Sequence, residues 1–165
     1  MSDNVTNVVI AGLGGQGVLR LSDILAHAAF LAGLDVKKAE VHGMSQRGGS
    51  VTSDVRFGEG VLSPMVPTGA ADYLVVLEET QLEPTRHLLR EGGELLLPAD
   101  IDVAALPTAK ALNVGMLGLL STHLDLPESD LRQAIKAFFP EKLHEANMEA
   151  FTLGRNAVNK ESADA

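Results

Sequence analysis

A glycine motif, Gly12-x-Gly14-x-x-Gly17, constrains the fold of this chain more than any other feature of its sequence. The residues before it, Asn7 to Ala11, form a short apolar run typical of a buried parallel strand. From Val18 to about Ala32 the apolar residues recur at helical spacing, and a second strand is predicted over Asp35 to Val41. Strand, glycine turn, helix and strand together form the first βαβ unit of a doubly wound sheet.

The rest of the chain continues the α/β pattern. Alternation over Val51 to Phe57 predicts a half-exposed strand, and the turn after it leads into Val61-Leu62, which indicates a β-hairpin insertion. Further along we expect a strand at 71–77, a helix at 79–90 broken by Gly92-Gly93, a strand at 94–97, and helices at 111–124, 127–139 and about 143–157. The segments 42–50 and 100–108 are expected to be loops, and 160–165 a frayed tail.

These elements predict one domain over residues 1–165, since a chain of 165 residues is too short for two. The expected fold class is α/β: a three-layer, Rossmann-like, mostly parallel sheet with helices on both faces and the hairpin insertion.

Composition excludes several classes of function. A net charge of −9 argues against nucleic acid and anionic membranes as partners, because phosphate binding requires clustered Lys and Arg. With no cysteine, the chain offers no thiolate nucleophile and no ligand for an iron–sulfur cluster. The five histidines lack metal-ligand spacing, so no metal site is expected. The polar, acidic start and the short apolar runs predict neither a signal peptide nor a membrane span, which makes the cytoplasm the expected location.

The glycine motif has two interpretations. With Glu40 near the end of the second strand it matches the fingerprint of NAD- or FAD-binding domains, in which the backbone of Gly12, Gly14, Gly15, Gln16 and Gly17 would approach a phosphate. Alternatively, the glycines serve only tight packing of strand against helix. The motif alone does not decide between them.

A second motif, Met44-Ser45-Gln46-Arg47-Gly48-Gly49, follows the second strand. It concentrates a cation, an amide, a hydroxyl and two glycines, and Arg47 is suited to pair with a carboxylate or phosphate. We therefore take Ser45, Gln46, Arg47, Gly48 and Gly49 as candidate binding residues. The alternative is that Arg47 forms a structural salt bridge and that the glycines serve a turn. No residue is expected to be catalytic, since Ser45 has no recognised His and Asp partners.

Taken together, several strings resemble the gamma subunit of 2-oxoacid:ferredoxin oxidoreductases, a module also found as the gamma domain of pyruvate:ferredoxin oxidoreductase and the beta subunit of indolepyruvate ferredoxin oxidoreductase. The likeness extends from about Val8 to Arg155, and its strings are Gly12–Gly17, His42–Gly49, Val55–Gly58, Ser63-Pro64, Gly69–Asp72, Glu78-Glu79, Asn113–Gly118 and Asn147–Gly154. Family members usually carry a further strand and helix where this chain has only Glu94 to Leu112, so a sheet one strand smaller is expected.

The resemblance implies a role without catalysis by this chain itself. Thiamine diphosphate, Mg²⁺ and [4Fe-4S] clusters belong to other subunits of the complex, which oxidatively decarboxylates a 2-oxoacid, usually to an acyl-CoA, and reduces ferredoxin. The implied partners are the thiamine-binding alpha and beta subunits and a ferredoxin-like delta subunit. The glycine loop and Gln46-Arg47 are the implied contact points for coenzyme A. A free-standing NAD- or FAD-binding protein, and an assembly module without any ligand, remain the alternatives.

Overall fold

The computed structural model describes residues 4–42 and 49–163, with side chains through Ala157. Its sheet has five strands in the order β2-β3-β1-β4-β5, namely β1 (Val5–Leu13), β2 (Asp35–His42), β3 (Ser50–Gly58), β4 (Ala71–Val76) and β5 (Leu89–Leu96). β1 pairs in parallel with β4, and β4 with β5, whereas β3 is antiparallel to both β1 and β2. Four strands therefore run one way, and the expected mixed, mostly parallel α/β sheet is confirmed.

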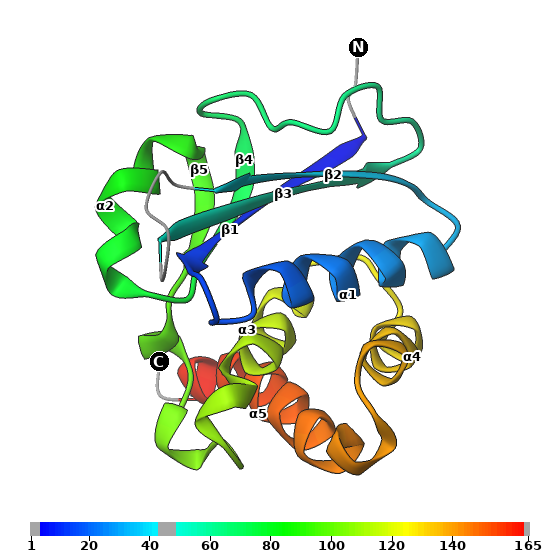
Figure 1. Cartoon of the computed structure of the whole chain (residues 1–165), viewed down its shortest axis with the longest axis vertical. Helices are drawn as coiled ribbons and strands as arrows, with labels where there is room; N and C mark the ends of the chain where they lie inside the picture. Colours follow the sequence, from blue (N-terminus) through cyan, green and yellow to red (C-terminus); the bar gives the residue numbers. More distant parts are fainter. Residues whose placement is uncertain (1–3, 43–48, 164–165) are drawn as a thin grey trace.

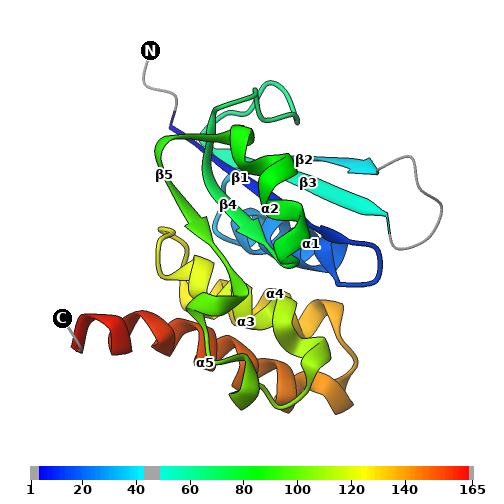
Figure 2. The ribbon, with the colours of Figure 1, turned by 90° about the vertical axis from the view of Figure 1, so that its left-hand side faces the viewer.

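The helices are distributed unequally over the two faces of the sheet (Figures 1 and 2). One face packs on the four longer helices, which are α1 (Val18–Leu31), α3 (Leu112–Ser121), α4 (Glu128–Phe138) and α5 (His144–Ala163). The other face is covered by the short α2 (Leu82–Thr85), its flanking 3-10 turns Glu79–Gln81 and Arg86–Leu88, and the segment before β4. Two apolar clusters, one on each side of the sheet, result from this arrangement.

Helix α3 lies at the centre of the larger cluster. It is apolar nearly all round, as the sequence indicates, and every residue from Asn113 to Ser121 is buried. α5 packs along it, and Phe151 of α5 is fully buried. α5 continues as helix to Ala163, past residue 160 where a frayed tail is expected.

The hairpin differs from the prediction. Val61-Leu62 form no strand, because the side chains of Asp35 and Lys37 on β2 take the backbone N–H and C=O of Val61. β3 instead pairs with β2, and the residues 43–48 that join them lie outside the described part of the chain. As a central strand, β3 is also more buried than the half-exposed strand expected.

The helix predicted over 79–90 and the strand over 94–97 are also corrected. The helical turns end at Leu88, and β5 begins at Leu89 and contains both glycines. Gly92 has φ 76°, and it lies where the register between β4 and β5 shifts, so the glycines accommodate an irregularity within the strand rather than ending a helix. Beyond β5 the backbone forms only short 3-10 turns, Pro98–Asp100, Val103–Ala105 and Ala109–Ala111, until α3 begins.

Candidate functional site

The glycine loop joins the carboxyl end of β1 to the first turn of α1, at the edge of the sheet where α/β proteins commonly bind ligands. Gly15 and Gly17 both have positive φ, 87° and 84°. Gly17 is the N-cap residue of α1 and supplies no side chain to the free N–H groups of the first turn. The loop thus exposes backbone donors at the positive end of a helix.

The side chain of Gln16 holds the loop in place. Its Oε1 accepts a hydrogen bond from the N–H of Leu13 at 2.7 Å, and its Nε2 donates to Oε2 of Glu78 at 2.9 Å. Glu78 lies two residues beyond the end of β4, the strand that pairs with β1. Gln16 therefore links the carboxyl ends of two neighbouring strands, and both polar atoms of its amide are bonded within the chain.

Two of the loop glycines are explained by packing. A Cβ at Gly12 would lie 2.8 Å from Cγ2 of Val18 and 3.0 Å from Oε1 of Gln16. A Cβ at Gly17 would collide with the amide of Asn113, which is 5% exposed and donates to the carbonyl of Gly17 at 3.3 Å. Gly15 differs, because nothing lies within 4 Å of the corresponding position. The tip of the loop at Gly15 is the part left open.

The structure brings one residue of the second motif to the loop. The carbonyl of Gly49 accepts a hydrogen bond from the N–H of Gly14 at 2.9 Å. The candidates Ser45, Gln46, Arg47 and Gly48 lie outside the described residues, so their part in the site stays a prediction. The Gly14–Gly49 bond nevertheless places the end of the second motif against the first.

A cavity lies on each side of the open tip. One, of about 480 Å³, is lined by the glycine loop, Arg20 and Asp23 of α1, and the ends of β2 and β3 at His42 and Val51. The other, of about 510 Å³, lies between Gly15–Gly17 and the start of α3, with Lys110 and Asn113 in its wall. Each cavity therefore carries one cationic side chain beside an accessible stretch of backbone.

Sequence reasoning missed Lys110 as a site residue, and it treated Glu78 and Asn113 only as parts of a resemblance. All three reach the loop from distant parts of the chain. Only Glu78 carried a usable signal, since it follows a predicted parallel strand at the same edge of the sheet as the glycine loop.

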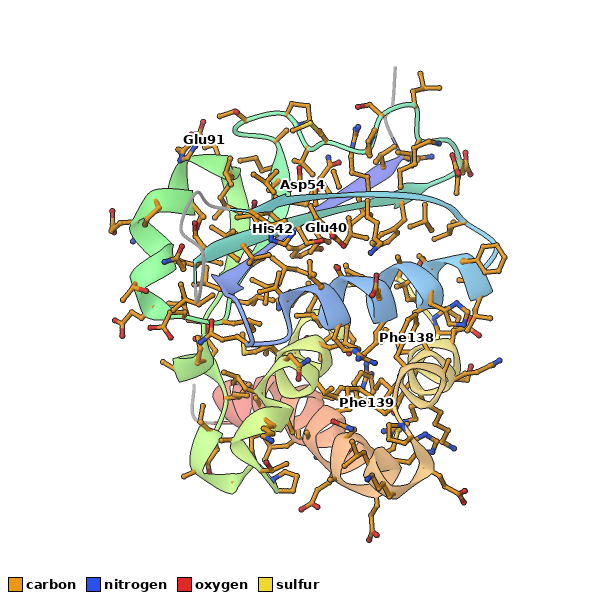
Figure 3. All side chains as sticks on the ribbon, viewed as in Figure 1. Glu40, His42, Asp54, Glu91, Phe138 and Phe139 are labelled. Carbon is orange, nitrogen blue, oxygen red and sulfur yellow. The ribbon has the colours of Figure 1, made fainter. Side chains whose placement is uncertain are left out.

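The topology weakens the dinucleotide interpretation. In that fingerprint the acidic residue ends the strand next to the glycine strand, but here β3 separates β2 from β1. Glu40 bonds Lys38 at 3.1 Å and points with His42 toward the α1 side of the sheet (Figure 3). Burial opposes the charged form of Lys38, yet hydrogen bonds to Asp23 and Glu40 outweigh burial and raise the pKa of Lys38 above 10.5. Glu40 is thus engaged by a cation one strand away from the loop.

The described part of the chain carries neither a cluster of metal-binding side chains nor a membrane-spanning helix. No group of three or more His, Asp or Glu side chains there is arranged to hold a metal ion. None of the helices within these residues is both long enough and apolar enough to cross a membrane.

Fold and loop together define an α/β module of the doubly wound type, with an antiparallel strand inserted beside its glycine strand. The model of the family "Pyruvate ferredoxin/flavodoxin oxidoreductase" matches residues 7–111. The chain is 32% identical to indolepyruvate oxidoreductase subunit IorB of Thermococcus kodakarensis, over 93% of this chain and 96% of that protein. The chain therefore belongs to the pyruvate ferredoxin/flavodoxin oxidoreductase family, as its strings of residues indicate.

Solved structures agree with this assignment. The gamma subunit of a keto/oxoacid ferredoxin oxidoreductase from Geobacter sulfurreducens shares the fold, with a TM-score of 0.80 at 22% identity over 92% of this chain and 97% of that one. Subunit PORC of the Thermotoga maritima pyruvate oxidoreductase gives a TM-score of 0.73 at 26% identity, over 92% and 96% of the two chains. The alignment with IorB runs over 194 positions, more than the 165 residues here, so that relative carries residues without a counterpart in this chain.

Proposed function

We propose that this chain is the gamma-type subunit of a cytoplasmic 2-oxoacid:ferredoxin oxidoreductase, and that it completes the complex without catalysing a step itself. The observation that carries the proposal is the similarity to IorB, which extends over nearly the full length of both proteins. Because IorB is named as an indolepyruvate oxidoreductase subunit, an aryl pyruvate such as indolepyruvate is the substrate class we expect first.

The donor atoms of the chain support a division of labour. It has no cysteine to ligate a cluster, so [4Fe-4S] clusters fit only a partner such as a ferredoxin-like delta subunit. Thiamine diphosphate with its Mg²⁺, which supplies the chemistry of decarboxylation, is assigned to the alpha and beta subunits. Ferredoxin is then the electron acceptor of the whole complex, and this subunit contributes contacts.

The glycine loop is the part of this chain we assign to coenzyme A, the acceptor of the acyl group. Its fit rests on the open backbone at Gly15 and on the two cations, Arg20 and Lys110, in the cavities beside it. Phosphate groups are bound well by backbone N–H donors together with Lys or Arg. Gln46 and Arg47 would add a further cation from the neighbouring motif.

Affinity purification of the tagged chain from anaerobic lysate tests the proposal. The purified fraction is expected to contain subunits with thiamine-binding and cysteine-rich cluster motifs, and to reduce viologen when a 2-oxoacid and coenzyme A are supplied. Comparing indolepyruvate, pyruvate, 2-oxoglutarate and 2-ketoisovalerate identifies the substrate. A chain recovered alone under conditions that preserve a known complex of this family, or a complex that keeps full activity without it, contradicts the proposal.

The role of the loop is tested separately in the purified complex. Arg47→Ala and Lys110→Ala are expected to raise the KM for coenzyme A while the subunits stay together in gel filtration. Unchanged kinetics with both variants would leave the chain as an assembly module without a ligand.

A further inference from the structure

The segment between β3 and β4, residues 59–70, exposes two large apolar side chains. This 59–70 loop crosses the face of the sheet opposite α1 (Figure 1). Leu62 is 99% exposed and Met65 is 56% exposed, so neither contributes much to the core. No residue from Gly60 to Gly69 carries a charge, although the chain as a whole has a net charge of −9. From Gly60 to Gly69 the loop therefore presents its two large apolar side chains without a charge beside them in the sequence.

Side chains of β2 hold the first half of this loop. Oδ2 of Asp35 accepts a hydrogen bond from the N–H of Val61 at 2.8 Å, and Nζ of Lys37 bonds the carbonyl oxygen of the same residue. The side chain of Val61 itself is 2% exposed. With both backbone groups bonded and its side chain buried, Val61 fixes the direction in which its neighbour Leu62 projects.

Side chains of β3 hold the second half. Nη1 of Arg56 donates to the carbonyl of Ser63 at 2.8 Å, and Oδ2 of Asp54 accepts from the N–H of Val66 at 2.9 Å. Asp54 is 8% exposed and lies on the side of the sheet that the loop covers (Figure 3). Met65 therefore stands between two anchored positions.

These contacts order the loop before anything binds it. Four charged side chains of the strands are used to position backbone groups of the loop. An ordered loop loses less conformational entropy on association than a flexible one, and a fully exposed leucine gains the most from being covered. The backbone is preorganised, and the apolar side chains it presents remain exposed to solvent within the described chain.

We propose that Leu62 and Met65 form a docking surface for another subunit of the complex, which covers them with an uncharged, apolar recess; this assignment rests on the proposed function. The loop lies within the residues 7–111 matched by the family model, and it includes the Ser63-Pro64 string that the resemblance singles out. A recess lined by charged residues does not suit it, because a charge buried against Leu62 would lose its hydration without a partner.

Charge also argues against a second copy of this chain as the occupant. Two copies would each bring a net charge of −9 to the contact, and the 59–70 loop supplies no cation to offset the repulsion. A different protein with an apolar recess meets no such penalty. Nucleic acid is unsuited for the same reason, since the loop has no Lys or Arg for phosphate.

The double variant Leu62→Ser/Met65→Ser tests the assignment, with Phe30→Ser as the matched control. Phe30 is 68% exposed on α1, so its replacement removes a similar apolar surface from another part of the molecule. Binding of each purified chain to the remaining subunits of the complex is measured by calorimetry. We expect the double variant to bind about tenfold to hundredfold more weakly, and the control to bind like the wild type. The loss should be the same at low and high salt, because no charge is removed.

A second variant separates ordering from apolar contact. Arg56→Gln keeps the apolar side chains of Leu62 and Met65 but removes the cation that holds the carbonyl of Ser63. We expect this variant to lose less affinity than the double variant. Melting curves of the free chains check folding, and the double variant should melt like the wild type because both side chains are exposed.

Four results would overturn the assignment. Unchanged affinity of the double variant, or an equal loss in Phe30→Ser, removes the loop as a specific contact. A wild-type dimer in sedimentation that the double variant dissociates would make the occupant a second copy. Failure of the wild-type chain to bind any 2-oxoacid oxidoreductase subunit contradicts the proposed function itself, and with it the occupant named here.

Discussion

Gly15 and Gly17 have nearly the same backbone conformation but different surroundings. Both have a positive φ that disfavours any side chain, yet only Gly17 lies against Asn113, whose amide occupies the space a Cβ would need. Conformation accounts for glycine at both positions, and close packing adds a second requirement at Gly17. The two positions therefore allow the two effects to be measured separately.

Gly17→Ala is expected to destabilise the chain more than Gly15→Ala. The left-handed backbone costs an alanine about 1–2 kcal/mol at either position, and displacement of the buried Asn113 adds about 1–3 kcal/mol at Gly17 alone. Urea denaturation of both variants and the wild type provides the measurement. Equal losses at the two positions would mean that Asn113 moves aside freely.

The contribution of Asp54 to the stability of the folded chain depends on pH. Burial raises the pKa of the Asp54 carboxyl above its ordinary value of 3.8, although the N–H of Val66 and the charge of Arg56 partly offset this. The folded state then binds the proton more tightly than the unfolded state, so the contribution of Asp54 to stability falls as pH rises from 3.8 through the raised folded pKa.

Asp54→Asn, which does not titrate, is expected to remove this dependence. The unfolding free energy of the wild type minus that of the variant should decrease over the acid range and become constant toward neutral pH, as measured by urea denaturation in a series of buffers. A difference that increases with pH would contradict the assignment.

At the scale of the elements, α3 and α5 touch through their backbones. A Cβ at Gly154 of α5 would lie 2.8 Å from the backbone nitrogen of Leu119 and would collide with the carbonyl of Gly115. A Cβ at Gly118 of α3 would meet the carbonyl of Phe151 in the same way. The glycines in the two C-terminal strings of the family resemblance therefore have a packing reason: they allow these helices to cross in contact.

Gly154→Ala is expected to destabilise the chain by at least about 2 kcal/mol, because the added methyl group meets backbone rather than a flexible side chain. Gly60→Ala is the matched control, since Gly60 has open space around it and should change stability by less than about 0.5 kcal/mol. Thermal unfolding followed by circular dichroism compares them. A stable Gly154→Ala variant would show that the helices separate at little cost.

Some elements could be predicted from sequence, and others could not, for identifiable reasons. α1 follows from apolar spacing ended by Gly33, α3 from a run that is apolar nearly all round, and α4 from the proline and acids at its start and Pro140 at its end. Their observed bounds lie within a few residues of the expected ones. Val61-Leu62 has the composition of a strand, but the side chains of β2 bond its backbone groups, and no local pattern reports such a contact. In the sequence Gly92-Gly93 has the pattern of a helix end. Only the pairing of β5 with β4 shows that the two glycines lie at a register shift within a strand.

For the molecule as a whole, the position of β3 separates this chain from a dinucleotide-binding domain. The sequence predicts the glycine loop and the strand before it, but it does not show that β3 lies between β1 and β2. It also does not show that Glu78 and Lys110 reach the loop, since both are brought there by the tertiary fold. The sequence therefore predicts the glycine loop of the candidate site but not the side chains that reach the loop from other parts of the chain.

The purified chain is expected not to bind NAD, NADP or FAD. Glu40 lies one strand too far from the glycine loop to take the place of the acidic residue in the dinucleotide fingerprint. Isothermal titration calorimetry with each dinucleotide is the measurement. Saturable micromolar binding that Gly15→Ala abolishes would restore the dinucleotide interpretation.

The burial of α3 has a consequence for biosynthesis. Ribosomes release the chain from its N-terminus, so α3 emerges before α5, the helix that covers it. During that interval the side of α3 that packs on α5 has no cover, and exposed apolar segments of nascent chains are the ones that aggregate or recruit chaperones. A chain interrupted before His144 keeps this surface uncovered. A chain that includes α5 therefore differs from one interrupted before it in having this side of α3 covered.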